Sequence, residues 1–560
     1  MATITGSAGN DTLLGTPFND VIETGGGLDR VDAGAGDDIV RLTGSVPDAN
    51  NVANIIDGGI GYDILDLTGW QGGLLVDNDV GGYFLGLYEW SDDRTHVAWV
   101  AYVRGFEEVH LSAGVQFSAY QQSDANPATL QGWKIVGSDG VDFITDSAGY
   151  DQIETGLGND IIHYMGGNDR ISLGDGDDDV WLEPNAGFLN QVTIDGGAGN
   201  DQLEVYRSSP ALHVKIDLAA GTGMAGNTSF VLANMENVSV DAPQGAAQGS
   251  GAVEIAGSGA DNSIRLTADV DAIVAGRGGS DAIQGYQSSR ALTAFGGSGD
   301  DYIYGGEGSD WLNGGGHAPG DTVPDSADDG ADYIDGKGGN DHIFGNSQSG
   351  VQGAADGGDR IFGGDGMDYV NGNAGNDAIF GGAGSDRLYG GADDDSIDGG
   401  SGADHLNGNK GNDTLEGGDG NDELLGGQGD DRLIGDAGFD TLIGNAGSDT
   451  FFITNFAHFA TSGPDAYRTD VIADFQDGQD KLGLYYYPAP TVLHPGSATD
   501  AASAFALAAS KLSGLGDSNV AAVQVGADSY LFFDNSGPGP LSAVKLLNVS
   551  AATIDAHDFI

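Results

Sequence analysis

Cysteine is absent from this 560-residue chain, and basic residues are scarce. The lack of cysteine excludes disulfides, thiolate zinc sites and cysteine nucleophiles together. Lysine and arginine number 20 against 85 aspartates and glutamates, which gives a formal net charge of −65. Because nucleic acids bind to basic patches, we expect no nucleic-acid partner. The same charge disfavours electrostatic docking on an anionic membrane surface.

Long apolar runs are missing as well. No stretch of the sequence approaches the length of about 18 residues that a membrane-spanning helix needs, so we expect no membrane span. The start, Met1-Ala2-Thr3, leads directly into a glycine-rich repeat at Gly6. It has neither a basic segment nor an apolar segment, a pattern that predicts no Sec-type signal peptide.

Recognisable catalytic motifs are also lacking. None of the 10 histidines is followed by glutamate, so the zinc-protease motif His-Glu-x-x-His is absent. Gly336-Lys337 is followed by Gly338, which does not fit a P-loop. Helix-forming stretches are too few for the strand–Ser–helix elbow of an α/β-hydrolase. Carboxylate pairs are so common here that none of them singles out a glycosidase site. We therefore expect no enzyme activity.

What the chain has in abundance is glycine, with 99 residues, much of it in a nine-residue repeat. Ten unbroken copies occupy residues 363–452 and read Gly-Gly/Asn/Asp-x-Gly-x-Asp-x-U-x, where U is a large apolar residue and Asp393 replaces one glycine at position four. Position six is held by Asp368, Asp377, Asp386, Asp395, Asp404, Asp413, Asp422, Asp431, Asp440 and Asp449. Position eight is held by Val370, Ile379, Leu388, Ile397, Leu406, Leu415, Leu424, Leu433, Leu442 and Phe451.

Each position of the repeat has a physical reason. Glycines at positions one, two and four permit the positive φ of a tight turn and leave backbone carbonyls free to face a ligand. The aspartate adds a hard carboxylate oxygen, and calcium takes about six to eight such oxygens. The last three residues predict a short strand with one inward side chain. Leu406 should therefore point inward, while His405 and Asn407 point outward.

Further copies of the repeat lie outside the ten-copy array. They start at Gly6, and polar insertions interrupt them near 314–326 and 345–353. Their position-six residues bring the candidate calcium ligands to 27: Asp11, Asp20, Asp29, Asp38, Asp63, Asp142, Asp151, Asp160, Asp169, Asp178, Asp201, Asp281, Asp301, Asp310, Asp332, Asp341 and Asp359.

The repeat resembles the calcium-binding nonapeptide of RTX (repeats-in-toxin) proteins. The resemblance implies a parallel β-roll in which two repeats make one coil and each calcium ion sits between the turns of repeats i and i+2. It implies many bound Ca²⁺ ions, with up to eight sites in the array. The competing interpretation, a disordered Gly/Asp-rich linker, does not require an apolar residue at every ninth position.

Two segments between the repeat blocks, 67–136 and 205–256, resemble each other and are expected to be wider β excursions of the coil. The first is rich in aromatic and polar side chains: Trp70, Tyr83, Phe84, Tyr88, Trp90, Arg94, His96, Trp99, Tyr102, Phe106 and Trp133. These side chains could fill a wide core, form a surface for a glycan or another partner, or line a catalytic pocket; core packing is the favoured interpretation.

Residues 453–560 differ from the rest. Residues 500–512 are alanine-rich and predict the one short helix, and strand-like runs follow at 521–525, 529–533 and 543–549. The stretch 470–484 and the final Asp558-Phe559-Ile560 resemble the C-terminal region of serralysin-type and related RTX proteins. That resemblance implies a small cap on the roll and an uncleaved secretion signal for a type I ABC exporter.

We therefore expect an all-β, parallel β-roll (β-helix) solenoid with a C-terminal cap. The expected segments are roll block 1 (1–66), the aromatic excursion (67–136), block 2 (137–204), the second excursion (205–256), block 3 (257–452) and the cap with the signal (453–560). The expected function is that of a secreted, extracellular calcium-binding protein, structural or associated with the cell surface, whose folding calcium drives. A glycan-binding adhesin or surface-layer module and an extracellular polysaccharide-modifying enzyme are the alternatives.

Overall fold

The computed structural model describes most of the chain. The described residues are 1–26, 29–43, 54–59, 62–68, 73–77, 84–88, 101–104, 108–111, 116–118, 132–146, 148–184, 190–207, 209, 211–241, 252–267, 269–285, 288–316, 330–346, 357–454, 469–484, 490–513, 519–533 and 541–560. They form two compact units, 1–270 and 271–560.

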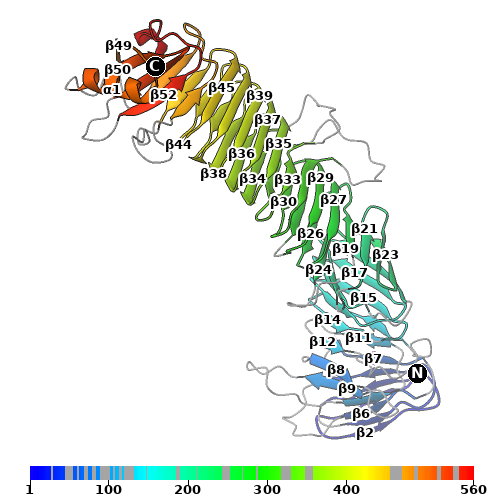
Figure 1. Ribbon diagram of the computed structural model, residues 1–560. Helices are drawn as coiled ribbons and strands as arrows, with labels where there is room; N and C mark the ends of the chain where they lie inside the picture. Colours follow the sequence, from blue (N-terminus) through cyan, green and yellow to red (C-terminus); the bar gives the residue numbers. More distant parts are fainter. Residues whose placement is uncertain are drawn as a thin grey trace. The chain divides into compact units, whose positions relative to one another are not determined.

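In the second unit, strands alternate along the chain between two parallel sheets, whose stacked rows are visible in Figure 1. One sheet holds β27 (Ala272–Gly278), β29 (Leu292–Ser298), β31 (Trp311–Gly315), β33 (His342–Phe344), β35 (Tyr369–Ala374), β37 (Arg387–Ala392), β39 (His405–Lys410), β42 (Glu423–Gln428), β45 (Thr441–Ala446) and β47 (Asp470–Ile472). The other holds β28 (Ala282–Gly285), β30 (Tyr302–Tyr304), β32 (Tyr333–Asp335), β34 (Arg360–Asp365), β36 (Ala378–Ala383), β38 (Ser396–Ser401), β40 (Thr414–Glu416), β41 (Asp419–Gly420), β43 (Arg432–Ile434), β44 (Ala437–Gly438), β46 (Thr450–Ile453) and β48 (Lys481–Leu484).

The register of the array follows from the repeat length. Leu388 pairs with Leu406, which pairs in turn with Leu424, so each coil contains two repeats. All three leucines are fully buried, whereas His405 and Asn407 are only partly buried. The alternation of inward and outward side chains expected at position eight is therefore confirmed. This all-β parallel roll is the fold that the repeat predicts.

Most array strands are longer than the expected three residues. β37 and β39 each contain six, because they continue through the first three positions of the next repeat. The ladder skips position one, where Gly390 and Gly408 lie, and resumes with Gly391 opposite Asn409. The turn is consequently shorter than expected, and its backbone is partly held by the neighbouring coils.

The first unit is built from the same kind of coil. Its parallel strands are β1 (Thr3–Thr5), β2 (Thr12–Leu14), β3 (Val21–Glu23), β4 (Arg30–Asp32), β5 (Ile39–Arg41), β6 (Asn54–Asp57), β7 (Ile64–Asp66), β10 (Ala101–Arg104), β11 (Glu108–His110), β12 (Gln116–Ser118), β13 (Lys134–Val136), β14 (Phe143–Thr145), β15 (Gln152–Leu157), β16 (Ile161–Tyr164), β17 (Arg170–Asp175), β18 (Asp179–Leu182), β19 (Asn190–Ala198), β20 (Gln202–Tyr206), β23 (Thr228–Ala233), β24 (Asn237–Asp241), β25 (Val253–Ala256) and β26 (Ser263–Leu266).

Each excursion adds an antiparallel arm to this coil. In the first, β8 (Gly73–Asp77) and β9 (Phe84–Tyr88) join β10, which runs parallel to β6. In the second, β21 (Val214–Asp217) and β22 (Thr222–Ala225) join β23, which runs parallel to β19. The same arrangement therefore occurs twice, as the sequence similarity of the two segments suggested, but as antiparallel arms on parallel coils.

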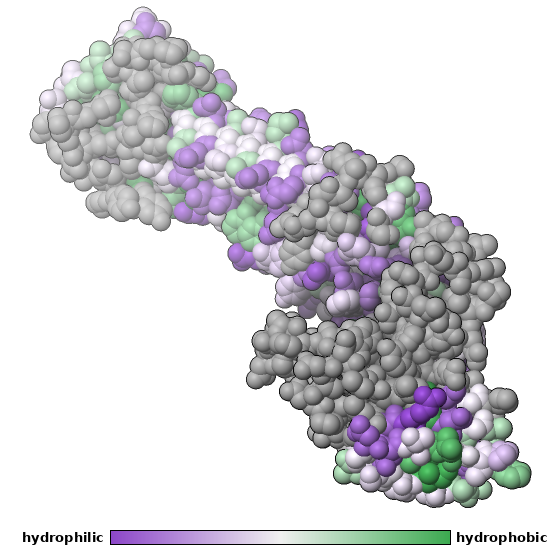
Figure 2. Space-filling model, turned by 90° about the horizontal axis from the view of Figure 1, so that it is seen from below, coloured by the Kyte–Doolittle hydropathy of each residue, from purple (hydrophilic) through white to green (hydrophobic). Residues whose placement is uncertain are grey.

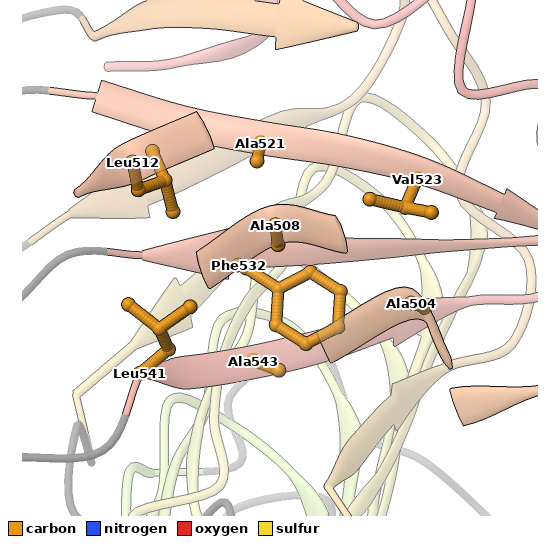
Figure 3. Packing of buried hydrophobic residues seen from close by; sticks show 8 residues of the cluster. All are labelled: Ala504, Ala508, Leu512, Ala521, Val523, Phe532, Leu541 and Ala543. Carbon is orange, nitrogen blue, oxygen red and sulfur yellow. The ribbon is translucent and has the colours of Figure 1, made fainter. Parts of the chain in front are cut away.

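The C-terminal cap contains α1 (Ala501–Leu512), β49 (Thr491–Ala498), β50 (Asn519–Val525), β51 (Asp528–Phe533), β52 (Ser542–Leu546) and the short 3₁₀ turn η2 (Ala556–Asp558). The helix begins after Asp500, whose side chain accepts a hydrogen bond from the Ser503 amide. Its inward face packs on β50–β52 around a cluster shown in Figure 3, made of Ala504, Ala508, Leu512, Ala521, Val523, Phe532, Leu541 and Ala543. β52 pairs with β47, which joins the cap to the roll.

Candidate calcium sites

The position-six aspartates form hydrogen-bonded ladders from coil to coil. The Asp386 amide donates to Asp404 Oδ1 at 2.8 Å, and the Asp404 amide donates to Asp422 Oδ1 at 2.9 Å. One carboxylate oxygen is thus fixed by the backbone of the preceding coil. The ladder holds the candidate ligands in register along an edge of the roll.

In the second unit there are two such ladders, and both cross the polar insertions. At the insertions the step between partners grows to 31 residues from Asp310 to Asp341 and to 27 residues from Asp341 to Asp368. One ladder contains Asp281, Asp301, Asp332, Asp359, Asp377, Asp395, Asp413, Asp431 and Asp449. The other contains Asp310, Asp341, Asp368, Asp386, Asp404, Asp422 and Asp440.

The predicted ligands of the first unit form shorter ladders. They are Asp11–Asp29, Asp20–Asp38–Asp63, Asp142–Asp160–Asp178–Asp201 and Asp151–Asp169. Asp11 is the only one of the 27 that is not buried.

The second carboxylate oxygen of the position-six aspartates lacks a donor throughout the array. In all ten array aspartates Oδ2 is buried and has no hydrogen-bond partner among the described residues. Burial is the first cause that raises the pKa of Asp395 to about 9, of Asp377 to about 8 and of Asp404 to about 7; neighbouring ladder carboxylates raise these pKa values further. Buried oxygens without a donor are costly unless a cation or a proton binds them.

Backbone oxygens converge on the same places. A Cβ atom added to Gly399 would lie 2.7 Å from Asp404 Oδ2 and 2.5 Å from the Gly417 carbonyl oxygen of the next coil. Glycine at position one of the array turns leaves this space open, because a side chain there would occupy the space beside these oxygens. Carboxylate and carbonyl oxygens together are the ligand set that calcium prefers, so the residues fit this ion.

The backbone conformation at position two differs between the array turns and the turns that supply a donor to Oδ2. In the array it is Gly, Asn or Asp with positive φ, for example 92° at Gly400 and 69° at Asn409. Elsewhere, at Thr16 and Ser138, the residue is not in this conformation, and its amide donates to Oδ2 of Asp20 and Asp142 at 2.6 and 2.7 Å. These turns supply a donor of their own.

Four residues of the ladders were not predicted from the nonapeptide pattern. The Asp440 and Asp449 amides donate to Asp470 and Asp480, which extend both ladders into the cap. Each of the two follows the rule of an aspartate two residues before an apolar one, so spacing alone could have found them.

The other two replace aspartate in the first unit. Glu236 accepts the Asp201 amide at 2.9 Å, and the Asn262 side-chain amide donates to the Glu236 carbonyl oxygen at 2.7 Å. Neither residue is an aspartate, and a pattern that requires Asp at position six cannot find them.

Of the aromatic residues singled out in the first excursion, the side chain of Trp133 is described. It is buried and contacts Phe117 edge-on, with ring centroids 6.2 Å apart. Phe84, Tyr88 and Tyr102 lie on β9 and β10, but their side chains are outside the described part of the structure. Also outside it are Trp70, Tyr83, Trp90, Arg94, His96, Trp99 and Phe106.

On the face shown in Figure 2, hydrophilic residues are spread over the described surface, with small apolar patches between them. Among the described residues there is no helix long and apolar enough to cross a membrane.

Comparison with protein families identifies the repeat. The family profile of the RTX calcium-binding nonapeptide repeat (4 copies) matches residues 5–40, 136–171, 165–187, 192–204, 293–316, 326–350, 354–388, 389–424, 398–433 and 425–452. A search of curated proteins found no match. Most of the ladder aspartates lie within the matched ranges, and the chain thus contains RTX calcium-binding nonapeptide repeats and folds as a parallel β-roll.

Proposed function

We propose that this protein is secreted and folds outside the cell when calcium binds to its roll, where it has a structural or surface-associated role without catalysis. The observation that carries the proposal is the set of ten buried Oδ2 atoms in the array that have no hydrogen-bond partner. At six of them a Cβ atom on the position-one glycine would meet both Oδ2 and a backbone carbonyl oxygen, as at Asp404 and Gly417. Bound calcium would supply the positive charge that these oxygens otherwise lack.

Linkage explains why calcium would control folding. Without the ion, stacked carboxylates must either repel one another or take up protons, and both lower the stability of the roll at neutral pH. An ion that binds only the folded chain stabilises it by RT ln(1 + [Ca²⁺]/Kd) at each site. Many weak sites together would leave the chain unfolded at cytosolic calcium and folded at extracellular calcium.

The proposal is tested by circular dichroism of the full chain. In excess EDTA we expect a spectrum of a largely disordered chain, and millimolar calcium should convert it to β structure. Magnesium at the same concentration is the control, because it prefers smaller, hydrated octahedral sites. Native β structure that persists in excess chelator would refute the linkage.

Export before folding agrees with the position of the C-terminal residues. Phe559 is buried, and the Ile560 amide donates to the Leu482 carbonyl oxygen at 3.1 Å. The Lys481 amino group donates to the His557 carbonyl oxygen at 2.9 Å. In the folded chain this tail packs on β48, so an exporter would have to bind it before the roll folds.

We therefore expect removal of residues 501–560 to retain the protein inside a producing cell that carries a type I exporter. The matched control deletes 363–452, which shortens the roll and keeps the tail, and it should still be exported. Normal secretion of the 501–560 deletion would contradict the assignment of the signal.

A further inference from the structure

Asp146 places a carboxylate at position one of its repeat, where the array turns have glycine. Asp146 stands at position one, where a side chain is directed toward the position-six carboxylate. It is fully buried, and its Oδ1 accepts a hydrogen bond from the Met165 amide of the next coil. The roll therefore accommodates an additional carboxylate inside the space that the array turns leave open at glycine.

Three carboxylates meet here. One oxygen each of Asp146, Asp151 and Asp169 lies within 4.8 Å of the others, and all three residues are buried. Asp151 Oδ1 accepts the Trp133 amide at 2.6 Å, and Asp169 Oδ1 accepts the Asp151 amide at 2.6 Å. Oδ2 of Asp146 and Oδ2 of Asp169 have no hydrogen-bond partner among the described residues. Two buried carboxylate oxygens of the cluster thus have no donor.

The backbone supplies a neutral oxygen at the same place. A Cβ atom on Gly167, which has a φ of 123°, would lie 1.8 Å from the Gly149 carbonyl oxygen and 2.8 Å from both carboxylate oxygens of Asp169. Calcium–oxygen distances are about 2.3–2.6 Å, so ligands on opposite sides of the ion are about 5 Å apart. The observed separations match that geometry.

Apolar residues close the cluster at both ends, so it is not a segment of a long ladder. Trp133 occupies the position-six place one coil earlier, and it is buried. One coil later, the pairing of Arg170 with Thr193 puts the buried Val192 opposite Asp169. Such surroundings exclude water and strengthen the interaction of the three carboxylates with any charge among them.

We propose that Asp146, Asp151 and Asp169, with the Gly149 carbonyl oxygen, form a separate three-carboxylate calcium site in the first unit. Two array aspartates in contact offer two carboxylates to an ion, and this site offers three. A higher charge count tightens calcium binding in oxygen sites. The site therefore fills at lower calcium than the array does and orders residues 148–172 first. The proposal deepens the proposed function, on which it rests for the identity of the ion.

The test is hydrogen–deuterium exchange of the full chain during a calcium titration, with peptides from 148–172 compared with peptides from 387–410. The variants are Asp146→Gly, which restores the common glycine, and Asp146→Asn, which keeps the size and removes the charge. Both should raise the calcium midpoint of 148–172 by about tenfold or more and leave the 387–410 midpoint unchanged. Asp139→Asn is the matched control, since Asp139 is exposed in the preceding turn, and it should move neither midpoint.

The outcomes separate the two proposals. If Asp146→Gly leaves the midpoint of 148–172 unchanged or lowers it, the extra carboxylate is not a ligand and the site is an ordinary turn. If 148–172 is as protected in chelator as in calcium, protons rather than an ion satisfy the cluster, and the proposal fails. If the protection of 387–410 does not change with calcium while that of 148–172 does, the proposed function fails and the three-carboxylate site stands. Unchanged 387–410 protection in saturating calcium verifies that each variant folds.

Discussion

The turn of Thr16 and the turns of the array share one repeat but satisfy its carboxylate differently. At Asp20, the Thr16 amide and hydroxyl donate to Oδ2 at 2.6 and 2.7 Å. The hydroxyl of Thr16 is the first cause that lowers the pKa of Asp20, whereas burial raises the pKa of Asp404 to about 7. The Asp404 Oδ2 has no hydrogen-bond partner among the described residues. The Asp20 carboxylate is thus satisfied within its own turn, whereas the Asp404 carboxylate requires a cation or a proton.

The difference arises from the backbone at position two. A left-handed φ is accessible to Gly and, less readily, to Asn and Asp, and it is strained for threonine. Threonine and serine keep negative φ and donate to the carboxylate four residues on. The rule applies turn by turn, because Gly34, in the same block as Thr16, has a φ of 102° and Oδ2 of Asp38 has no partner. In turns without a further carboxylate, the backbone at position two therefore predicts which turns depend on calcium.

The largest effect on folding is expected from a substitution in the apolar core, which lies beneath both kinds of turn. Leu406→Ala should destabilise the roll by about 2–5 kcal/mol, because the leucine is fully buried between Leu388 and Leu424. Folding and calcium binding are coupled, so the variant should need more calcium to fold although no ligand is lost. A calcium titration followed by circular dichroism measures the shift.

His405→Ala is the matched control for Leu406→Ala. His405 is only partly buried, and its ring contacts Glu423 at 2.9 Å on the outer face of the sheet. Such exposed pairs contribute about 0–1 kcal/mol, so the midpoint should hardly move. Equal shifts for the two variants would mean that packing at position eight does not limit folding.

A smaller effect is expected at a single ligand. Asp404→Ala removes a ladder member between Asp386 and Asp422 and should weaken the sites on both sides of it. Asp11→Ala removes a partly exposed carboxylate that already accepts the Ser7 amide and hydroxyl at 2.6 and 2.8 Å. We expect the calcium midpoint to rise more for Asp404→Ala. If isothermal titration shows the same loss of bound calcium in both, turns with and without an internal donor are equivalent.

Much of this architecture could be predicted from periodicity. Aspartate at position six and an apolar residue at position eight determine which residues point inward and which stack from coil to coil, and the stacking of Leu388 on Leu406 follows directly. The helix at 501–512 also followed from local composition and the capping Asp500. These features depend on contacts that recur at constant spacing.

Other features depend on contacts that no period encodes. The antiparallel pairing of β21 with β22 needs a chain reversal inside an excursion, and its partner could not be chosen from alternation alone. Glu236 joins a ladder because β24 returns to the roll beside β20, and not because of its spacing. Asp146 was missed because it occupies position one, and the pattern takes only position-six residues as ligands.

The smallest expected effect tests position two itself. Thr16→Gly removes the hydroxyl donor and allows the left-handed conformation, so the Asp20 turn should come to resemble an array turn. Exchange protection of residues 16–23 should then need more calcium than in the unmodified chain. Thr16→Val keeps the amide donor and a β-branched side chain and loses only the hydroxyl bond, worth about 1 kcal/mol; its shift should be the smaller one. Hydrogen–deuterium exchange over a calcium titration distinguishes the two. If Thr16→Gly and Thr16→Val shift the midpoint equally, the hydroxyl alone matters, and the backbone conformation at position two does not decide which turns depend on calcium.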